Sequence, residues 1–299
     1  MKMIRPLTVT DAILTGSTIP EDDYPEWASG TTYAQGDKVI LASTHSIYEA
    51  LQATTGDDPS EDSSAFWLRT KATNRWRAFD EVMGEQATRA VSLAYTFEPG
   101  QYVSAVGFFE LSATSLRVVM NDPTDGEVYN RTIGLVDTTD IVDWYAFLFG
   151  EITYKPEIII DDLPPYSAAS VTLTVSNPDG TAGVGQIVMG EGLTLGRTSP
   201  GTTVGGNDYS SIDRTDFGTA SVTRRAYTRR VNYVFTLPSQ DTNRVDGLIS
   251  ARRATPTVFY TDQGAEGLGT LIFGLARPLE IDLQSTPLAR ASLEVESLT

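Results

Sequence analysis

Hydrophobic and polar residues alternate over short segments through much of this chain. Val, Ile, Thr, Tyr and Phe are concentrated in these segments, and turn-forming Gly, Pro, Asn and Asp separate them. A two-residue period predicts β-strands that turn one face toward a core. In the middle of the chain such segments read AVSLAYTF, YVSAVGFFEL, SLRVVM, GEVYNRTIGL, PEIIIDDL, ASVTLTVS and GQIVMG.

Short strands at this spacing are typical of a β-sandwich, here of a jelly-roll-like kind. Within it, ASVTLTVSNPDGTAGVGQIVMG predicts a β-hairpin. Val171, Leu173 and Val175 would share its buried face, and the Pro-Asp-Gly sequence would form the turn.

One segment has a helical period. SQDTNRVDGLISARRAT places Val245, Leu248 and Ile249 on one face, and Asp241 or Thr242 would be the N-cap. This segment therefore predicts a helix in the last third of the chain.

Two further segments have no single interpretation or no regular structure. DIVDWYAFLFG at 140–150 fits either a helix or a buried strand. GRTSPGTTVGGNDYSS at 196–211 is rich in Gly, Ser and Thr, which indicates a long loop or a flexible connector.

We therefore predict a mainly β protein with four parts. Residues 1–20 form an N-terminal arm, 21–75 a small carbohydrate-binding-like β module, 76–190 the β-sandwich, and 191–299 a C-terminal assembly domain. The last part combines the helix with strands such as RRVNYVFTL, GTLIFGLA and ASLEVESL, which predicts an α+β or β-barrel-like unit.

Charge is distributed unevenly along the chain. The net charge is −17, and residues 1–185 hold 27 acidic and 11 basic side chains, whereas 186–299 hold 12 acidic and 11 basic ones, all of them Arg. A nucleic acid partner needs a basic face, so this balance argues against one. The sequence also has no apolar run long enough for a membrane span and no signal-peptide core at its start, so we expect synthesis in a cytoplasm.

Few residues suit catalysis or metal binding. Cys is absent, which excludes thiolate chemistry and Cys-based zinc sites, and the one His, His45, lies in a turn where we expect it at the surface. Acidic turns at 121–127 and 177–180 lack a full calcium-loop signature, and no phosphate-binding Gly-rich loop is present. We expect no enzyme activity, catalytic residue, metal or cofactor.

The stretch beginning at Trp27 raises the question of a sugar-binding surface. Its order of Trp, Tyr, Gly-Asp-x-Val, Tyr-x-Ala, Gly-x-x-Pro and Trp resembles small chitin- and cellulose-binding modules over about residues 24–70. The resemblance implies candidate glycan-binding aromatics at Trp27, Tyr33, Tyr48 and Trp67, although such rings also make the core of a module this small. The paired tryptophans that commonly follow Tyr-x-Ala in that family are Gln52-Ala53 here.

A broader resemblance covers nearly all of residues 24–299. The phrases TNRWRAFD, DLPPY and SLEVESLT, among others, resemble a family of tailed-bacteriophage tail-tip or baseplate proteins. That resemblance implies a virion protein of the tail, made in the host cytoplasm, whose partners are other tail proteins and further copies of itself in a ring.

Four arginines in TRRAYTRR are candidate subunit-interface residues. If the segment is extended, Arg225 and Arg229 share one face, while Arg224 and Arg230 share the other. Their guanidinium groups would pair with carboxylates of a neighbouring subunit, or they would keep an edge strand solvated and resistant to aggregation. Nucleic acid binding is a third interpretation.

The function we predict is a structural component of a phage tail tip or baseplate that binds tube or hub proteins and contacts host-surface glycans. The alternative is a lectin-like carbohydrate-binding protein without a tail role.

Overall fold

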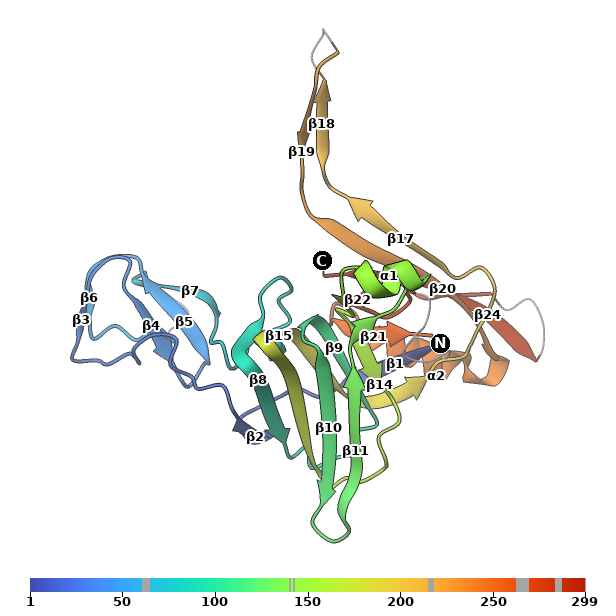
Figure 1. The fold of residues 1–299 in the computed structure, drawn as a ribbon, viewed down its shortest axis with the longest axis horizontal. Helices are drawn as coiled ribbons and strands as arrows, with labels where there is room; N and C mark the ends of the chain where they lie inside the picture. Colours follow the sequence, from blue (N-terminus) through green and yellow to red (C-terminus); the bar gives the residue numbers. More distant parts are fainter. Residues whose placement is uncertain are drawn as a thin grey trace.

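The computed structural model describes residues 1–60, 65–139, 141, 143–214, 218–261, 269–282 and 287–298, without the side chains of residues 146 and 147. The fold is mainly β, as predicted, and most strands join one large antiparallel sheet. Figure 1 shows a small lobe at one side, a central sandwich, a C-terminal unit and a long hairpin that projects from them.

The small lobe contains a three-stranded sheet in the order β4-β5-β7 and a short pair, β3 with β6. These strands are β3 (Thr32–Tyr33), β4 (Lys38–Leu41), β5 (Ser46–Ala50), β6 (Thr54–Thr55) and β7 (Trp67–Ala72). A 3₁₀ turn, η1 (Arg77–Phe79), follows the lobe.

The sandwich has its core between two layers of strands. One layer pairs β11-β10-β15-β8-β2, and the other pairs β14-β9-β15. The strands are β2 (Leu14–Ser17), β8 (Ala87–Phe97), β9 (Ala105–Ser112), β10 (Ser115–Asp122), β11 (Gly126–Gly134), β14 (Ile158–Ile160) and β15 (Ser170–Thr194). Buried side chains of both layers form one hydrophobic cluster, so the predicted sandwich is confirmed.

The predicted hairpin at 169–190 was wrong, because this region is the single 25-residue strand β15. Val171, Leu173 and Val175 do share a buried face, as expected. The turn residues instead form a bulge: β15 pairs with β8 through Ser176, shifts register, and pairs with β8 again from Thr181. Asn177 closes the bulge by donating its side-chain amide to the carbonyl of Thr181 (3.0 Å).

The first residues of the chain lie inside the large sheet. β1 (Lys2–Pro6) pairs with the end of β15 on one side and with β21 (Thr257–Tyr260) on the other. Met1, Met3 and Ile4 are fully buried. Residues 1–20 were predicted to form an N-terminal extension, but β1 in this segment joins the sandwich to the C-terminal unit.

The C-terminal unit surrounds a second hydrophobic cluster that includes Tyr233 and Phe235. Its strands are β16 (Arg197–Thr198), β20 (Tyr227–Pro238), β22 (Ile272–Ala276), β23 (Glu280–Asp282) and β24 (Leu288–Ser297). The path β15-β1-β21-β22-β24-β20-β16 is open, so no strand pair among the described residues closes it into a barrel.

The predicted helix is present as α2 (Thr242–Ser250), preceded by the 3₁₀ turn η2 (Ser239–Asp241). Val245 and Ile249 are buried against the second cluster. Asp241 is the N-cap residue but makes no side-chain capping hydrogen bond, so packing of the apolar face holds this helix.

Two excursions leave the body of the protein. The arm, which we define as residues 203–214 and 218–230, contains β17 (Thr203–Asp208), β18 (Ser211–Arg214), β19 (Ala220–Thr223) and the start of β20. The second excursion contains β12 (Val136–Asp137), α1 (Trp144–Phe149) and β13 (Thr153–Tyr154). Residues 140–150, for which the sequence left helix and strand open, therefore contain a short helix. No helix in the described part of the chain is long and apolar enough to cross a membrane.

Candidate interaction surfaces

The candidate glycan-binding aromatics form the core of the small lobe. Tyr33, Tyr48 and Trp67 are buried in one cluster, and Trp27 is half-buried against it. The rings of Tyr33 and Trp67 meet edge to face at 5.2 Å between centroids. Most of the ring surface is therefore used in folding, as a lobe of this size requires, and Trp27 keeps the largest exposed fraction of the four.

Hydrogen bonds fix these rings in place. The Trp67 indole donates to the carbonyl of Asp57 (3.0 Å), and the Tyr33 hydroxyl accepts from the backbone N–H of Ala28 (2.9 Å). The turn after Tyr48, at Gln52-Ala53, is exposed and contributes no aromatic ring.

His45 lies between the small lobe and the rest of the chain rather than freely at the surface. Its ring stacks on that of Trp76, with centroids 3.9 Å apart and planes 19° apart. Its two nitrogens lie 3.1 Å from Glu21 and 3.0 Å from Asp11. Its side chain is only 20% exposed, so His45 connects the lobe to the N-terminal segment and to the start of the sandwich.

The four candidate interface arginines fall into two pairs. Arg229 and Arg230 lie at the base of the arm and form ion pairs within the chain, to Glu157 (2.6 Å) and Glu294 (3.9 Å) respectively. Arg224 and Arg225 are exposed farther along the arm. The structure thus leaves the second pair accessible to another molecule.

Glu296 holds the base of the arm to β24. Its carboxylate accepts hydrogen bonds from Asn207 (3.3 Å), Tyr209 (3.1 Å), Thr228 (3.3 Å) and Arg277 (3.0 Å). The Arg277 bond is the main reason why the pKa of Glu296 lies below its usual value. The base is therefore fixed, while the farther part of the arm consists of the paired strands β18 and β19, whose pairing is with each other in the part of the chain that the structure describes.

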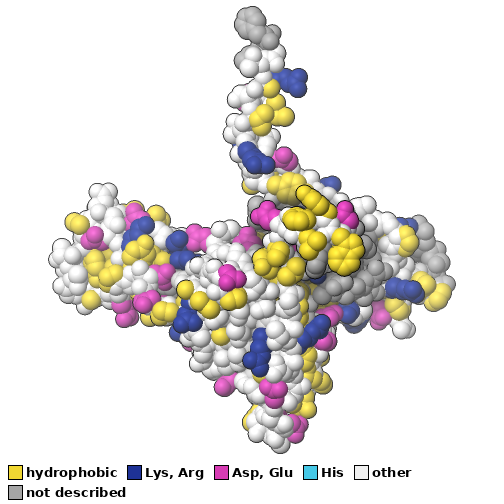
Figure 2. Space-filling model, viewed as in Figure 1, with side chains coloured by type: hydrophobic (Ala, Val, Ile, Leu, Met, Phe, Trp, Pro, Cys, Tyr) yellow, Lys and Arg dark blue, Asp and Glu magenta, His cyan; other side chains and the backbone are white. Residues whose placement is uncertain are grey.

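The arm and α1 expose large apolar side chains that sequence reasoning missed as interaction residues. Ile212 and Val222 on the arm are 61% and 66% exposed. On α1, Trp144 is 80% exposed, and Tyr145, Leu148 and Phe149 are each at least 65% exposed. Figure 2 shows apolar side chains gathered over α1 near the base of the arm. The apolar run WYAFLF was the sequence feature that marked this surface. Its interpretation as a buried strand, however, predicts that these side chains are buried rather than exposed.

We also considered clefts and groups of possible metal ligands as candidate sites. An open cleft of about 530 Å³ in the C-terminal unit is lined by charged side chains, including Glu280, Asp282 and Arg290. No group of three or more His, Asp or Glu side chains in the described residues is arranged to hold a metal ion.

Comparison with known proteins finds similarity among solved structures only. No family model and no curated protein matches the chain. Similar solved structures include chitosan-binding module 1 of a chitosanase/glucanase from Paenibacillus sp. IK-5 and a selenomethionine-labelled mutant of that module. Each is 12% identical and covers 38% of this chain, and 83% and 81% of the respective modules are matched, at a TM-score of 0.25. This is a weak similarity to a carbohydrate-binding module and does not establish a shared fold.

Proposed function

We propose that this chain is a structural subunit of a bacteriophage tail tip or baseplate, where it assembles with further copies of itself and with other tail proteins. The resemblance of its sequence phrases to that family motivates the proposal. The observation that carries it is the arm, whose outer strands, β18 and β19, form a two-stranded ribbon with exposed apolar residues. An isolated ribbon of this kind is marginally stable in water, so it gains its support from another molecule.

Exposed apolar surface on α1 favours the same role. Clusters of large apolar side chains at the surface mark sites of protein or membrane contact. A subunit that is buried in an assembly uses such surfaces, whereas a free monomer is exposed to aggregation through them. This role needs no catalytic residue, cofactor or nucleic acid. The protein would be made in the host cytoplasm and would then be located in the virion tail.

Glycan contact by the small lobe is the second candidate function. Trp27 is half-buried, and the nearby Tyr24 is 38% exposed, so the lobe presents some aromatic surface for stacking on a sugar ring. In an assembly with several copies, weak contacts of this kind would add up to firm attachment. The same contact without assembly would make the chain a lectin-like protein.

The test is the oligomeric state of the purified chain, alone and mixed with the products of neighbouring tail genes. Light scattering and negative-stain microscopy are expected to show a ring or incorporation into a tail complex. A monomer that joins no complex at any concentration would overturn the structural role. A glycan array with wild type and Trp27→Ala then tests the second candidate, which predicts binding that the substitution weakens.

A further inference from the structure

The outer part of the arm is amphipathic. Ile212 and Val222 are register partners in the β18–β19 pair, so their side chains lie next to each other on one face. The opposite face carries Ser211, Asp213 and Ser221, because side chains alternate along a strand. One face therefore carries Ile212, Val222 and Ala220 together with Arg214, whereas the other face is polar throughout.

No core lies under that apolar face within the described residues of this chain. Figure 1 shows β18 and β19 projecting away from the rest of the molecule, and every residue of β19 is exposed. Antiparallel sheets alternate in this way when one face packs against another layer.

A second exposed apolar surface lies at α1. We define this α1 surface as Trp144, Tyr145, Leu148, Phe149 and Ile152. Its five side chains are each at least 64% exposed. The helix has only six residues, too few for stability in isolation, and the rings of Tyr145 and Phe149 contact each other at 5.0 Å rather than a core. It offers a broad apolar platform beside the short β12–β13 pair.

The charges around the two surfaces have opposite signs. In sequence, residues 136–155 hold four acidic side chains and one Lys. In β18, Arg214 lies two residues from Ile212 and therefore on the same face, whereas Asp213 lies on the opposite face. On the arm, Arg214, Arg224 and Arg225 are exposed. Near α1, Asp137 and Glu151 are acidic residues that a guanidinium group would pair with.

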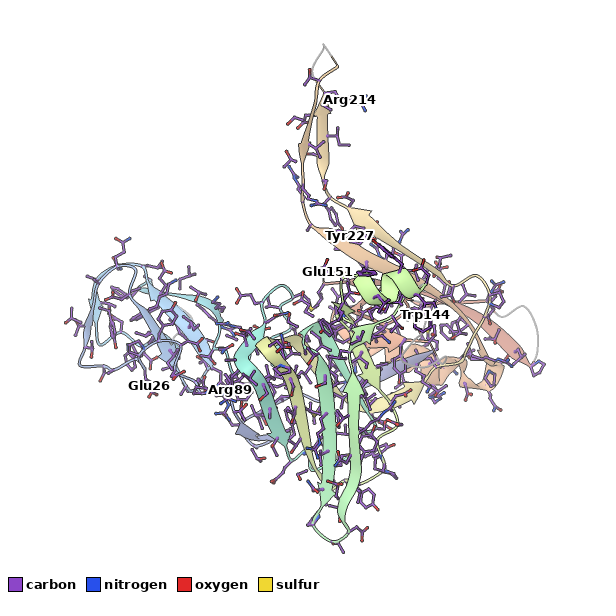
Figure 3. The ribbon with its side chains drawn as sticks, in the orientation of Figure 1. Glu26, Arg89, Trp144, Glu151, Arg214 and Tyr227 are labelled. Atoms are coloured by element: carbon purple, nitrogen blue, oxygen red, sulfur yellow. The ribbon has the colours of Figure 1, made fainter. Side chains whose placement is uncertain are left out.

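We propose that the apolar face of the arm docks on the α1 surface of a second copy of this chain. The proposal rests on the assembly role given above and names the surfaces that mediate it. Figure 3 shows Arg214 near the far end of the arm and Trp144 on α1 beside its base, so the arm of one copy points away from its own α1. The acidic rim disfavours the anionic headgroups of a membrane as the occupant.

Because the two surfaces differ, each copy either exchanges arms with a single partner, which gives a two-fold dimer, or gives its arm to one neighbour and receives an arm from another, which is a heterologous contact. Such contacts produce a closed ring when the rotation closes and a filament when it does not. In both arrangements the intact arm of one variant docks on the intact α1 surface of the other, so variants that fail alone are expected to complement each other in a mixture.

The experiment uses two variants of the full chain, one with Ile212→Asp and Val222→Asp, the other with Tyr145→Ser and Phe149→Ser. Each variant alone is expected to remain a monomer by sedimentation velocity. Mixed in equal amounts, they are expected to form a dimer and nothing larger, because one intact arm meets one intact α1 surface. All four residues are exposed, and circular dichroism checks that both variants fold.

A matched control places the same charge on the polar face of the arm. Ser211→Asp with Ser221→Asp is expected to assemble like wild type. If wild type assembles and the arm and α1 variants assemble equally well, this docking is overturned while the assembly role stands. If wild type is a monomer at all concentrations and joins no tail complex, both are overturned. Loss of vesicle or glycan binding in the α1 variant, without loss of assembly, would assign α1 to that ligand and also overturn the docking.

Cross-linking gives a second, independent readout, because the chain has no Cys. A Val222→Cys chain mixed with a Leu148→Cys chain is expected to form a disulfide-linked dimer under mild oxidation. Ser221→Cys, on the opposite face of the same strand, is expected to cross-link at least tenfold less. Equal yields from Val222→Cys and Ser221→Cys would overturn the proposed orientation of the arm.

Discussion

The carboxylate of Glu296 accepts a hydrogen bond from the hydroxyl of Tyr209, 3.1 Å away at the base of the arm. The other oxygen of the same carboxylate accepts a hydrogen bond from Arg277 (3.0 Å). β24 therefore holds the root of a hairpin whose outer part receives no support from the rest of the described chain. The rigidity of this root sets the direction in which the arm reaches a neighbour.

Replacing Glu296 by Gln is expected to loosen the root of the arm. The amide keeps the shape but loses the charge, so its bonds to Arg277 and to the arm weaken by about 1 kcal/mol in total at this partly exposed site. Hydrogen exchange at residues 205–210 is expected to accelerate several-fold. Glu280→Gln, a substitution at an exposed Glu away from the arm root, is the control and is expected to leave that exchange unchanged.

The same site gives a pH dependence with a defined sign. Arg277 lowers the pKa of Glu296 in the folded chain, so the ionised form stabilises the fold above the unfolded pKa, about 4.3 for a Glu side chain. As the pH falls through the folded pKa, that contribution is lost. Protection of the arm root is therefore expected to decrease below about pH 4.3 in wild type, and less steeply in Glu296→Gln. An identical decrease in both proteins would contradict this role for Glu296.

Gly190 allows β15 to approach β1 closely. A Cβ atom at this position would overlap the carbonyl oxygen of Arg5, which is backbone and cannot move aside alone. Gly190→Ala is expected to lower the free energy of unfolding by about 3 kcal/mol, measured by urea denaturation. Gly134→Ala, on β11 with open space around its Cβ position, is the matched control. A small effect at Gly190 would mean that β1 is not held in this register.

Local patterns predicted the elements that local interactions determine. Alternation at Val171, Leu173 and Val175 gave a buried strand face, and helical spacing at Val245 and Ile249 gave α2, because these periods follow from backbone geometry. The core role of the small lobe's aromatics was likewise one of the two interpretations that their spacing offered.

Non-local pairing is what the sequence could not predict. The turn residues between Ser176 and Thr181 suit a hairpin, yet they form a bulge, because β8 continues as the partner on both sides of it. Val91 lies on β8 within the register shift and has φ of +65°. β-Branched residues rarely adopt this left-handed conformation, so the sequence does not predict it. The burial of Met1 and Met3 depends on β15 and β21, which lie far along the chain.

The candidate surfaces depend on exposure, which composition does not determine. The run at Trp144–Phe149 is as apolar as a core helix, and Ile212 and Val222 are single apolar residues between polar neighbours. Only the placement of these segments outside both cores separates contact residues from core residues.

Trp67 is expected to be essential for the small lobe, and Trp27 much less so. Trp67 is 5% exposed and donates its indole N–H to Asp57, so Trp67→Ala removes a buried ring and leaves a cavity. The expected loss is about 3–5 kcal/mol in the unfolding of the lobe, whereas Trp27→Ala is expected to cost about 1–2 kcal/mol. Limited proteolysis within residues 21–75 reports both. Equal losses would show that Trp27 is needed for the fold and would remove it as a distinct ligand site.

His45 is expected to hold the small lobe to the sandwich through stacking on Trp76 more than through its hydrogen bonds to Glu21 and Asp11. Its φ of +51° is left-handed, a region that Asn tolerates, so His45→Asn removes the ring without added backbone strain. The loss of the stack and of the contact to the half-buried Glu21 is expected to cost about 1–2 kcal/mol, measured by urea unfolding followed through Trp fluorescence.

Asp11→Asn separates the two contributions, because the Asp11 side chain is 75% exposed and its pair with His45 is solvated. That variant is expected to lose less than about 0.5 kcal/mol. If both variants lose the same amount, the hydrogen bond to Asp11 rather than the ring stack connects the lobe. If neither variant changes stability but small-angle scattering shows that the lobe of His45→Asn has changed position, His45 fixes the orientation of the lobe without contributing to the stability of the fold.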